Sequence, residues 1–300
     1  MLDLHRLMLL REIKTRGSMS AAARNLSYSH SAISQQMGLL EKETGVVLLE
    51  RSGRGVRLTD AAEQLVRHTE AVLTILERAE SDLASAHAEV RGSVRIAAFS
   101  TVIRTVMPEA LLRLRQLYPE LDVEVEQFEP EEGLARLAGN RVDLLVADEY
   151  PSIPLSVGSA LHAELLCSDP VRVYLPAGGT TDSVADLGEV SWVMEPSGTA
   201  SFAWAQRLCR EMGFEPKVRY QSADLLFHLR MVEAGLAAAF LPGLVVKETS
   251  NDLRTSTVFS DDLTRGIHAI SRQGSQGRPV ILACQAVLRE VMATLSTASP

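Results

Sequence analysis

The chain has 300 residues, of which 46% are hydrophobic and 23% are charged, and its formal net charge is −8 at pH 7. This length exceeds one ordinary hydrophobic core, so two or more domains are expected. The balance of apolar and charged residues is that of a globular protein and excludes a disordered chain. The apolar run over residues 235–246 is interrupted by Pro242 and is too short to span a bilayer, so no membrane partner is expected.

The first residues lack the basic start and apolar core of a signal peptide. The three cysteines, Cys167, Cys209 and Cys284, are widely spaced, with no CxxC pair. Neither a disulfide framework nor a metal site is therefore expected, and a cytoplasmic location is predicted. Residues 1–60 hold nine Lys/Arg and six Asp/Glu, so a basic head precedes an acidic remainder and suggests an anionic partner for the head.

Three helices are predicted at the N-terminus. Asp3 caps a helix that runs to about Arg16 and stops at Gly17. A short helix over residues 19–26 and a third over residues 30–44 follow, which makes a helix-turn-helix candidate.

The third helix has a core face and a polar face. Ile33, Met37 and Leu40 recur at helical spacing and are expected to be buried. The small or amide-bearing side chains opposite them suit base edges in a major groove. The residues predicted to read bases are His30, Ser31, Ser34 and Gln35. The alternative is that these polar side chains only face solvent on the outer side of the helix.

A basic hairpin comes next, with strands over residues 46–50 and 56–58. It resembles a wing that grips phosphates. The predicted phosphate contacts are Ser29, Arg51, Arg54 and Arg57. An ordinary arginine-rich exposed turn is the alternative.

A long helix is predicted from Asp60 to about Val90, with Thr59 as its N-cap. One set of residues recurs alternately three and four positions apart, as do the residues that face the partner helix in a coiled coil. We call this set the seam. Its residues are Ala62, Leu65, Thr69, Val72, Leu76, Ala79, Leu83, Ala86 and Val90. The pattern predicts a dimer, and a helix packed only on its own domain is the alternative.

The remaining chain alternates strands and helices in two units, which predicts mostly parallel sheets with helices on both faces. The expected strands cover residues 93–99, 121–128, 142–147, 163–167, 171–175, 192–194, 217–221, 237–241 and 264–270. The expected helices cover residues 102–118, 131–137, 201–212, 223–234 and 280–295.

A small effector, an anion or a zwitterion, is predicted to bind in a cleft between the two α/β units, because polar residues follow strands in both. The predicted effector contacts are Ser100, Thr101, Glu129, Asp148, Ser197, Gly198, Thr199, Gln221 and Ser222. The carboxylates would repel a dianion but suit the ammonium of an amino acid. The alternative for each hydroxyl is that it caps its own helix.

The segments 21–36, 39–41, 45–51 and 57–59 resemble the helix-turn-helix of the LysR-type transcriptional regulators, and 118–119, 137–143, 232–236 and 241–242 resemble landmarks of that family's effector domain. The resemblance implies an α/β protein with an α-rich N-terminal winged helix-turn-helix, a dimerising linker helix, and a periplasmic-binding-protein-like (type 2) effector domain of two α/β subdomains. It also implies a homotetramer that bends promoter DNA when a small molecule enters the cleft, and RNA polymerase is a candidate partner. His30 and Gly38 depart from the family's usual reading face, and Ala62 replaces a usual glycine.

The expected domains are residues 1–59, the linker helix 60–91 and the effector domain 92–300, with subdomain I over 92–161 and 267–300 and subdomain II over 162–266. An enzyme is not expected, because no GxSxG, HExxH or phosphate-cradling glycine loop is present. A cytosolic solute-binding module without a DNA role is the other alternative. Redox-active cysteines occur in this family, but apolar neighbours favour buried, inert thiols here.

Overall fold

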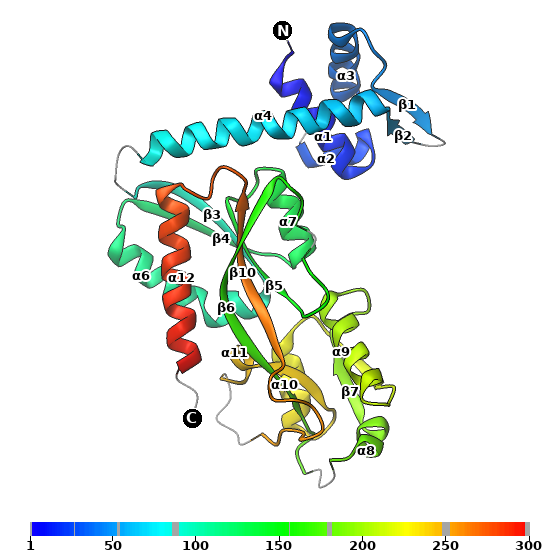
Figure 1. The fold of residues 1–300 in the computed structure, drawn as a ribbon, viewed down its shortest axis with the longest axis vertical. Coiled ribbons are helices and arrows are strands. Elements are labelled where there is room, and N and C mark those ends of the chain that lie inside the picture. Colours follow the sequence, from blue (N-terminus) through cyan, green and yellow to red (C-terminus); the bar gives the residue numbers. More distant parts are fainter. Residues whose placement is uncertain are drawn as a thin grey trace. The chain divides into compact units, whose positions relative to one another are not determined.

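The computed structural model describes residues 2–26, 28–52, 55–85, 90–155, 157–178, 182–247 and 253–297 (Figure 1). The chain forms two compact units, Met1–Ala86 with Arg272–Gly277, and His87–Ser271 with Arg278–Pro300. In the part of the chain that the structure describes, no helix has the length and apolarity needed to cross a membrane.

The N-terminal unit is a winged helix-turn-helix followed by a long helix. Its helices are α1 (Leu4–Arg16), α2 (Met19–Leu26), α3 (His30–Thr44) and α4 (Asp60–Ser85), and its antiparallel wing strands are β1 (Leu49–Ser52) and β2 (Gly55–Leu58). The Asp3 side chain accepts from the Arg6 N–H at 3.3 Å, and Gly17 ends α1 at φ 71°. The predicted limits of α1, α2 and α3 are confirmed, and α1 and α3 carry capping residues at both ends.

Apolar side chains from all four helices form one core. Its most buried members are Leu9, Leu10, Ile13, Ala22, Ile33, Met37, Leu40, Leu48, Ala62 and Val66. The buried Glu12 carboxylate joins α1 to α2, because it accepts from Arg16 Nε at 2.8 Å and from Asn25 Nδ2 at 2.6 Å.

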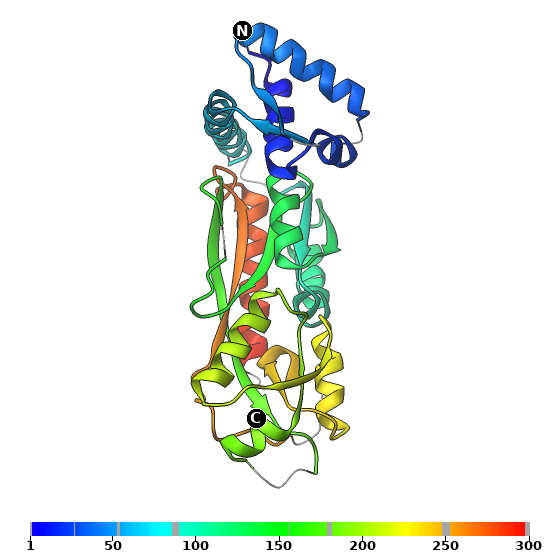
Figure 2. The same ribbon diagram turned by 90° about the vertical axis from the view of Figure 1, so that its right-hand side faces the viewer.

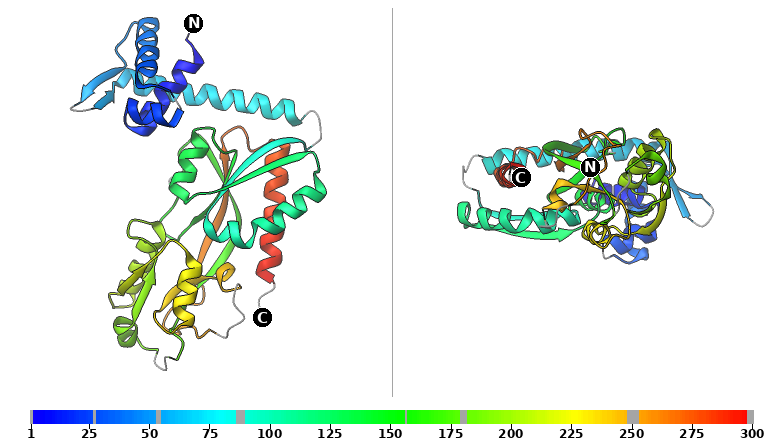
Figure 3. Two further views of the ribbon diagram at one scale, coloured as in Figure 1. Left: turned by 180° about the vertical axis from the view of Figure 1, so that it is seen from behind. Right: turned by 90° about the horizontal axis from the view of Figure 1, so that it is seen from below.

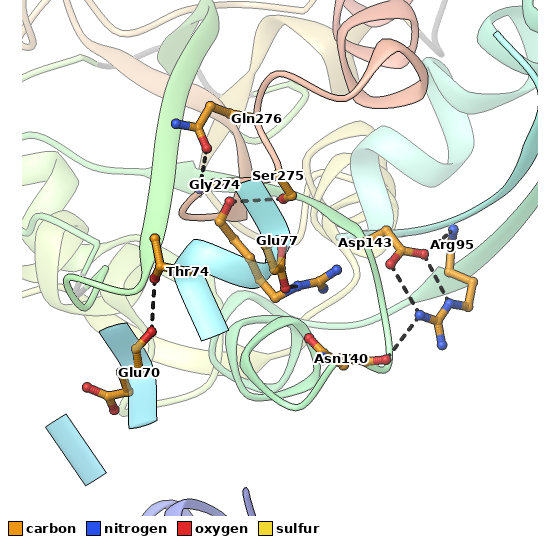
Figure 4. Close-up of polar contacts among 10 residues, drawn as sticks. Glu70, Thr74, Glu77, Arg95, Asn140, Asp143, Gly274, Ser275 and Gln276 are labelled. Atoms are coloured by element: carbon orange, nitrogen blue, oxygen red, sulfur yellow. Dashed lines mark hydrogen bonds and ion pairs between the residues drawn. The ribbon is translucent and has the colours of Figure 1, made fainter. Parts of the chain in front are cut away.

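The segment Arg272–Gly277 packs on α4 within this unit. Arg272 and Glu77 form an ion pair. Gly274 lies against the helix backbone with φ +99°, and a Cβ there would come within 2.6 Å of the Thr74 carbonyl oxygen, so no other residue fits (Figure 4).

The predicted seam of α4 divides into two parts. Ala62, Leu65 and Thr69 are buried or half-buried and pack inside the N-terminal unit, so the prediction that they face a partner chain is wrong. From residue 72 onward the seam is exposed, and exposed apolar side chains line this stretch: Val72, Ile75, Leu76 and Leu83. Ala86 lies outside the described residues. Val90 is not helical and packs on the core of the C-terminal unit.

The C-terminal unit is built on a six-stranded sheet with the order β4-β3-β5-β10-β6-β9. Its strands are β3 (Gly92–Ala98), β4 (Leu121–Gln127), β5 (Leu144–Glu149), β6 (Leu161–Tyr174), β9 (Ala239–Pro242) and β10 (Thr264–Arg272). The long strands β6 and β10 run side by side between the two halves of the unit (Figure 2). A separate parallel pair, β7 (Ser191–Met194) and β8 (Lys217–Gln221), belongs to the second half.

The helices of this unit cover both halves. They are α5 (Ser100–Thr105), α6 (Met107–Leu117), α7 (Pro130–Ala138), α8 (Val184–Glu189), α9 (Ala200–Glu211), α10 (Leu225–Glu233), α11 (Gly243–Val246) and α12 (Pro279–Thr297). Helices α6 and α12 pack together beside the first half of the sheet (Figure 3). Arg95 of β3 donates from Nε to Asp143 at 3.1 Å and from Nη2 to the Asn140 carbonyl at 3.0 Å, which joins β3 to the loop before β5 (Figure 4).

Three features differ from the sequence prediction. The helix expected over 102–118 is broken at Val106 into α5 and α6, and the two strands expected within 163–175 are one continuous β6. The sheet is less parallel than predicted, because β10 pairs antiparallel with β5, and β6 pairs antiparallel with β9. Alternating strands and helices in a sequence indicate parallel strands joined by helices. This alternation does not reveal strands that pass from one subdomain back to the other and pair antiparallel there.

Candidate functional site

The first candidate site is the exposed face of α3. Ser29 caps the helix, and its Oγ accepts from the Ala32 N–H at 3.1 Å. Ile33, Met37 and Leu40 are buried as predicted, which turns the opposite polar face to solvent. The exposed members of that face are His30, Ser31, Ser34, Gln35 and Gly38. A Cβ on Gly38 would meet no atom within 4 Å, so this position leaves open space on the face.

The wing follows directly. Glu41 of α3 holds its base, because its Oε1 accepts from the Leu48 and Leu49 N–H groups at 2.8 and 3.2 Å. On β2, the Arg57 side chain is 75% exposed and lies 3.4 Å from the Glu50 carboxylate. Arg54 lies outside the described residues, and the side chain of Arg51 does too.

The second candidate site is a cavity of about 540 Å³ in the C-terminal unit that opens to solvent. It lies where the ends of β3 and β5 meet the starts of α7 and α9. Its lining residues are Phe99, Ser100, Thr101, Glu129, Pro130, Glu131, Asp148, Tyr150, Leu155, Glu195, Thr199, Ala200, Ser201, Ala223, Leu225 and Arg265.

Five of the predicted effector contacts line this cavity: Ser100, Thr101, Glu129, Asp148 and Thr199. Four others do not: Ser197, Gly198, Gln221 and Ser222. Ser197 and Gly198 form an exposed turn in which Gly198 has φ 105°. The Ser222 hydroxyl accepts from the Asp224 N–H at 3.1 Å instead. The Thr199 hydroxyl caps α9 by accepting from the Phe202 N–H at 3.2 Å, so the capping alternative holds for Thr199. It does not hold for Ser222, because Asp224 is the residue that caps α10.

Arg265 is the central residue that the sequence prediction missed. It is fully buried at the start of β10. Its Nε and Nη2 donate to Asp169 at 3.1 and 2.9 Å, and its Nη1 donates to Asp148 at 3.0 Å. The guanidinium also lies over the Phe99 ring, 5.2 Å from its centroid, and contacts Tyr150. A single arginine opening an apolar strand was the available signal, because a buried charge requires partners.

The cavity is acidic. Its described lining holds four carboxyl side chains, Glu129, Glu131, Asp148 and Glu195, against one arginine. Burial, and then the charge of Asp148, raises the pKa of Glu195 to about 8, although Ser201 donates a hydrogen bond to it. Partial burial, Asp148 and Glu131 also raise the pKa of Glu129. At neutral pH, the Glu195 carboxyl group is therefore largely protonated.

We expect Glu195→Gln to stabilise the protein most at alkaline pH. Folded Glu195 keeps its proton where the unfolded chain has lost it, so stability falls as pH rises through the interval that ends near pH 8. Glutamine removes this penalty. Thermal denaturation should give a Tm about 3–8 °C above wild type at pH 8, and nearly equal values at pH 4.5. A difference that does not widen with pH, or an equal gain from the exposed control Glu132→Gln, would contradict the assignment.

The Thr101 hydroxyl is a further unsatisfied group in this lining. Thr101 is 3% exposed, and its Oγ1 has no hydrogen-bond partner among the described residues. A buried hydroxyl without a partner costs free energy, which a ligand can recover. Among the described residues, no group of three His, Cys, Asp or Glu side chains is arranged to hold a metal ion.

None of the three thiols is among the residues that line the cavity. Burial raises the pKa of Cys167 to about 11 and those of Cys209 and Cys284 to about 12. Cys167 contacts Met292, with the two sulfur atoms 3.5 Å apart. Thiols with such pKa values are almost entirely protonated at neutral pH and are weak nucleophiles.

Comparison with known families identifies both units. Residues 4–63 match the bacterial regulatory helix-turn-helix model of the lysR family, and residues 87–293 match the LysR substrate binding domain. The chain belongs to the LysR family of transcriptional regulators. It is therefore a DNA-binding transcriptional regulator with a C-terminal effector-binding domain, which confirms the family, fold class and function predicted from the sequence.

Several LysR proteins resemble this chain over nearly its whole length. A probable hydrogen peroxide-inducible genes activator of Streptomyces viridosporus is 30% identical over 282 residues, covering 91% of this chain and 89% of its own. Among solved structures, a full-length OxyR variant from Pseudomonas aeruginosa matches with a TM-score of 0.63 and 20% identity over 96% of this chain and 95% of that one. Full-length CbnR complexed with its target DNA matches with a TM-score of 0.51 and 24% identity over 96% and 99%.

Proposed function

We propose that this LysR regulator reads promoter DNA with the exposed face of α3, holds phosphates with its wing, and responds to a small effector in the acidic cavity. The observation that carries the proposal is the polar face of α3, which is exposed beside the wing while the opposite face is buried. This is how helix-turn-helix proteins present a recognition helix to the major groove. The solved structure of CbnR with its target DNA offers a related example of the fold.

The base-reading residues are His30, Ser31, Ser34 and Gln35, and the phosphate contacts are Ser29, Arg51, Arg54 and Arg57. The Ser29 and Ser31 hydroxyls lie 3.0 Å apart. The Ser29 oxygen already accepts from the Ala32 N–H, so Ser29 can donate its hydroxyl hydrogen to a phosphate when Ser31 is the donor of the bond between the two hydroxyls. Gln35 bears an amide that can bind adenine in a bidentate manner.

The expected assembly is a dimer through the exposed part of α4, and a homotetramer of two such dimers. The exposed apolar stretch from Val72 to Leu83 supports the dimer, because such a surface is seldom left in water. A dimer would place two α3 helices on an inverted repeat. RNA polymerase is a further expected partner, and a cytoplasmic location is expected because promoter DNA is the proposed ligand.

The effector is expected in the acidic cavity. Strand β10 carries Arg265 at the end that meets this cavity. Of the two effector classes predicted from the sequence, a zwitterion suits the four carboxyl groups better than a plain anion.

A peroxide-sensing role, suggested by the name of the Streptomyces relative, has little support in this chain. Peroxide reacts with thiolates, and the pKa values of all three thiols are raised to about 11 or 12. Effector binding without thiol chemistry is therefore the mode we propose.

The division between base and phosphate contacts can be tested with two variants. Bound sequences are first selected from a random duplex library, and affinities are then measured between 50 and 200 mM salt. Gln35→Ala should cost roughly 1–3 kcal/mol at one base pair and relax preference there. Arg57→Ala should weaken all sequences alike and reduce the salt slope by about one unit. The assignment is wrong if Arg57→Ala changes base preference while Gln35→Ala does not.

A further inference from the structure

We propose that the effector is a small organic cation, whose ammonium group binds among the carboxyl groups of Glu195, Asp148 and Glu129 and which brings no carboxylate of its own. The inference rests on the proposed effector site and specifies the chemical class that the site takes. It departs from the anion and zwitterion expected from the sequence.

The lining offers a carboxylate no available cation. Arg265 is the one basic residue among the described lining side chains. Its Nε, Nη1 and Nη2 all donate to Asp169 or Asp148, and Asp169 is itself only 3% exposed. A ligand carboxylate would have to compete with these two carboxylates for the charge of the guanidinium, whereas an ammonium group meets acceptors that are already in place.

The hydrogen bonds of the lining hydroxyl groups also favour a cationic ligand. The Thr199 hydroxyl accepts from the α9 backbone and donates to the Pro196 carbonyl at 3.0 Å, so both of its roles are used. Thr101 is different, because its buried Oγ1 is unpartnered among the described residues and the residue lines the cavity. An ammonium has three N–H donors, and this oxygen can accept one of them while the carboxylates accept the others.

The cavity walls suit aliphatic substituents on the cation. Phe99, Tyr150, Leu155 and Leu225 provide apolar surface beside the acidic groups. A second, smaller cavity of about 350 Å³ begins beyond Glu195 and shares Tyr150, Ser201 and Leu225 with the first. Its further lining includes Phe202, Trp204 and Phe240. Aromatic faces attract cations, so this end of the site also favours an alkylammonium ligand.

Proton release should accompany binding. Burial raises the pKa of Glu195 to about 8, and a bound ammonium would favour the ionised carboxylate. The charged or titratable groups around Glu195 are Asp148 on β5, Tyr150 directly after β5, Glu129 before α7, His228 on α10 and Arg265 on β10. Burial lowers the pKa of His228 and raises that of Tyr150, so burial favours the neutral form of each side chain. Affinity for an alkylamine should therefore rise from pH 6 to pH 8.

A four-carbon series tests the proposal by calorimetry on the full chain at pH 7.5. The compounds are butylamine, 1-butanol, butyrate and 2-aminobutyrate, which present a cation, a neutral group, an anion and a zwitterion. Butylamine should bind at least tenfold more tightly than the other three, and its affinity should increase from pH 6 to pH 8. The assignment is overturned if butyrate or 2-aminobutyrate binds as tightly as butylamine, or if none of the four binds.

Two variants localise the contact. Glu195→Gln should weaken butylamine at least tenfold and leave 1-butanol within twofold, and it is expected to fold because it removes a buried ionisable group. Glu132→Gln removes the same charge from an exposed position on α7 outside the lining and should change neither affinity more than twofold. Equal effects of the two variants would overturn the proposal. If wild-type protein selects specific DNA but ignores butylamine, only the cation assignment fails, whereas absence of specific DNA binding refutes the proposed function itself.

Discussion

Replacing Leu76 with aspartate should abolish the dimer and reduce operator affinity by at least about 100-fold. Leu76 lies in the middle of the exposed apolar stretch of α4 and is itself 43% exposed in the single chain. In the proposed dimer, the new carboxylate would be buried without a partner, which costs several kcal/mol, and every 1.4 kcal/mol is tenfold in affinity. A monomer also loses the gain from binding two half-sites at once.

The substitution touches no expected DNA contact and no core residue, so the α/β unit should keep its Tm. Sedimentation and operator titration on the same samples measure mass and affinity together. Ala71→Asp is the matched control, because Ala71 is exposed on α4 to one side of the apolar stretch. Unchanged mass and affinity in Leu76→Asp, or equal losses in both variants, would place the dimer contact elsewhere.

Local signals made the N-terminal unit predictable. The limits of α3 follow from Ser29 and Gly45, and its buried face follows from the spacing of Ile33, Met37 and Leu40. These are properties of neighbouring residues, which a sequence displays directly. The seam of α4 was only partly predictable, because the same heptad spacing serves intradomain packing at Thr69 and an exposed stripe from Val72 onward.

The sequence predicted where the cavity lies but not the charge of its lining. Residues after strands in both subdomains were expected to meet, and Ser100, Asp148 and Thr199 do so. Its electrostatics depend on pairings that are distant in sequence. Arg265 joins Asp148 and Asp169 across 117 and 96 residues, and no spacing rule predicts which carboxylate will neutralise which arginine. An uncommitted arginine would have favoured an anion, and its pairing reverses that expectation.

Replacing Arg265 with methionine should destabilise the effector-binding domain by about 3–5 kcal/mol. Methionine keeps the length and apolar bulk but leaves Asp169, which is 3% exposed, without its cationic partner. Removing one member of a buried ion pair has this cost because the other charge stays in a poorly solvating environment. For a unit of this size, Tm should fall by roughly 10 °C.

Arg104→Met provides the matched control. Arg104 pairs with Asp224 in the same unit, but the two side chains are 36% and 50% exposed, so its loss should cost less than about 1 kcal/mol. Asp169→Asn added to Arg265→Met should recover part of the stability, because the amide oxygen can still accept from the Leu244 N–H without leaving a charge unpaired. A Tm for Arg265→Met equal to that of the control would show that the buried pair contributes no more than a surface one. A double variant less stable than Arg265→Met alone would show that the stranded charge is not the source of the loss.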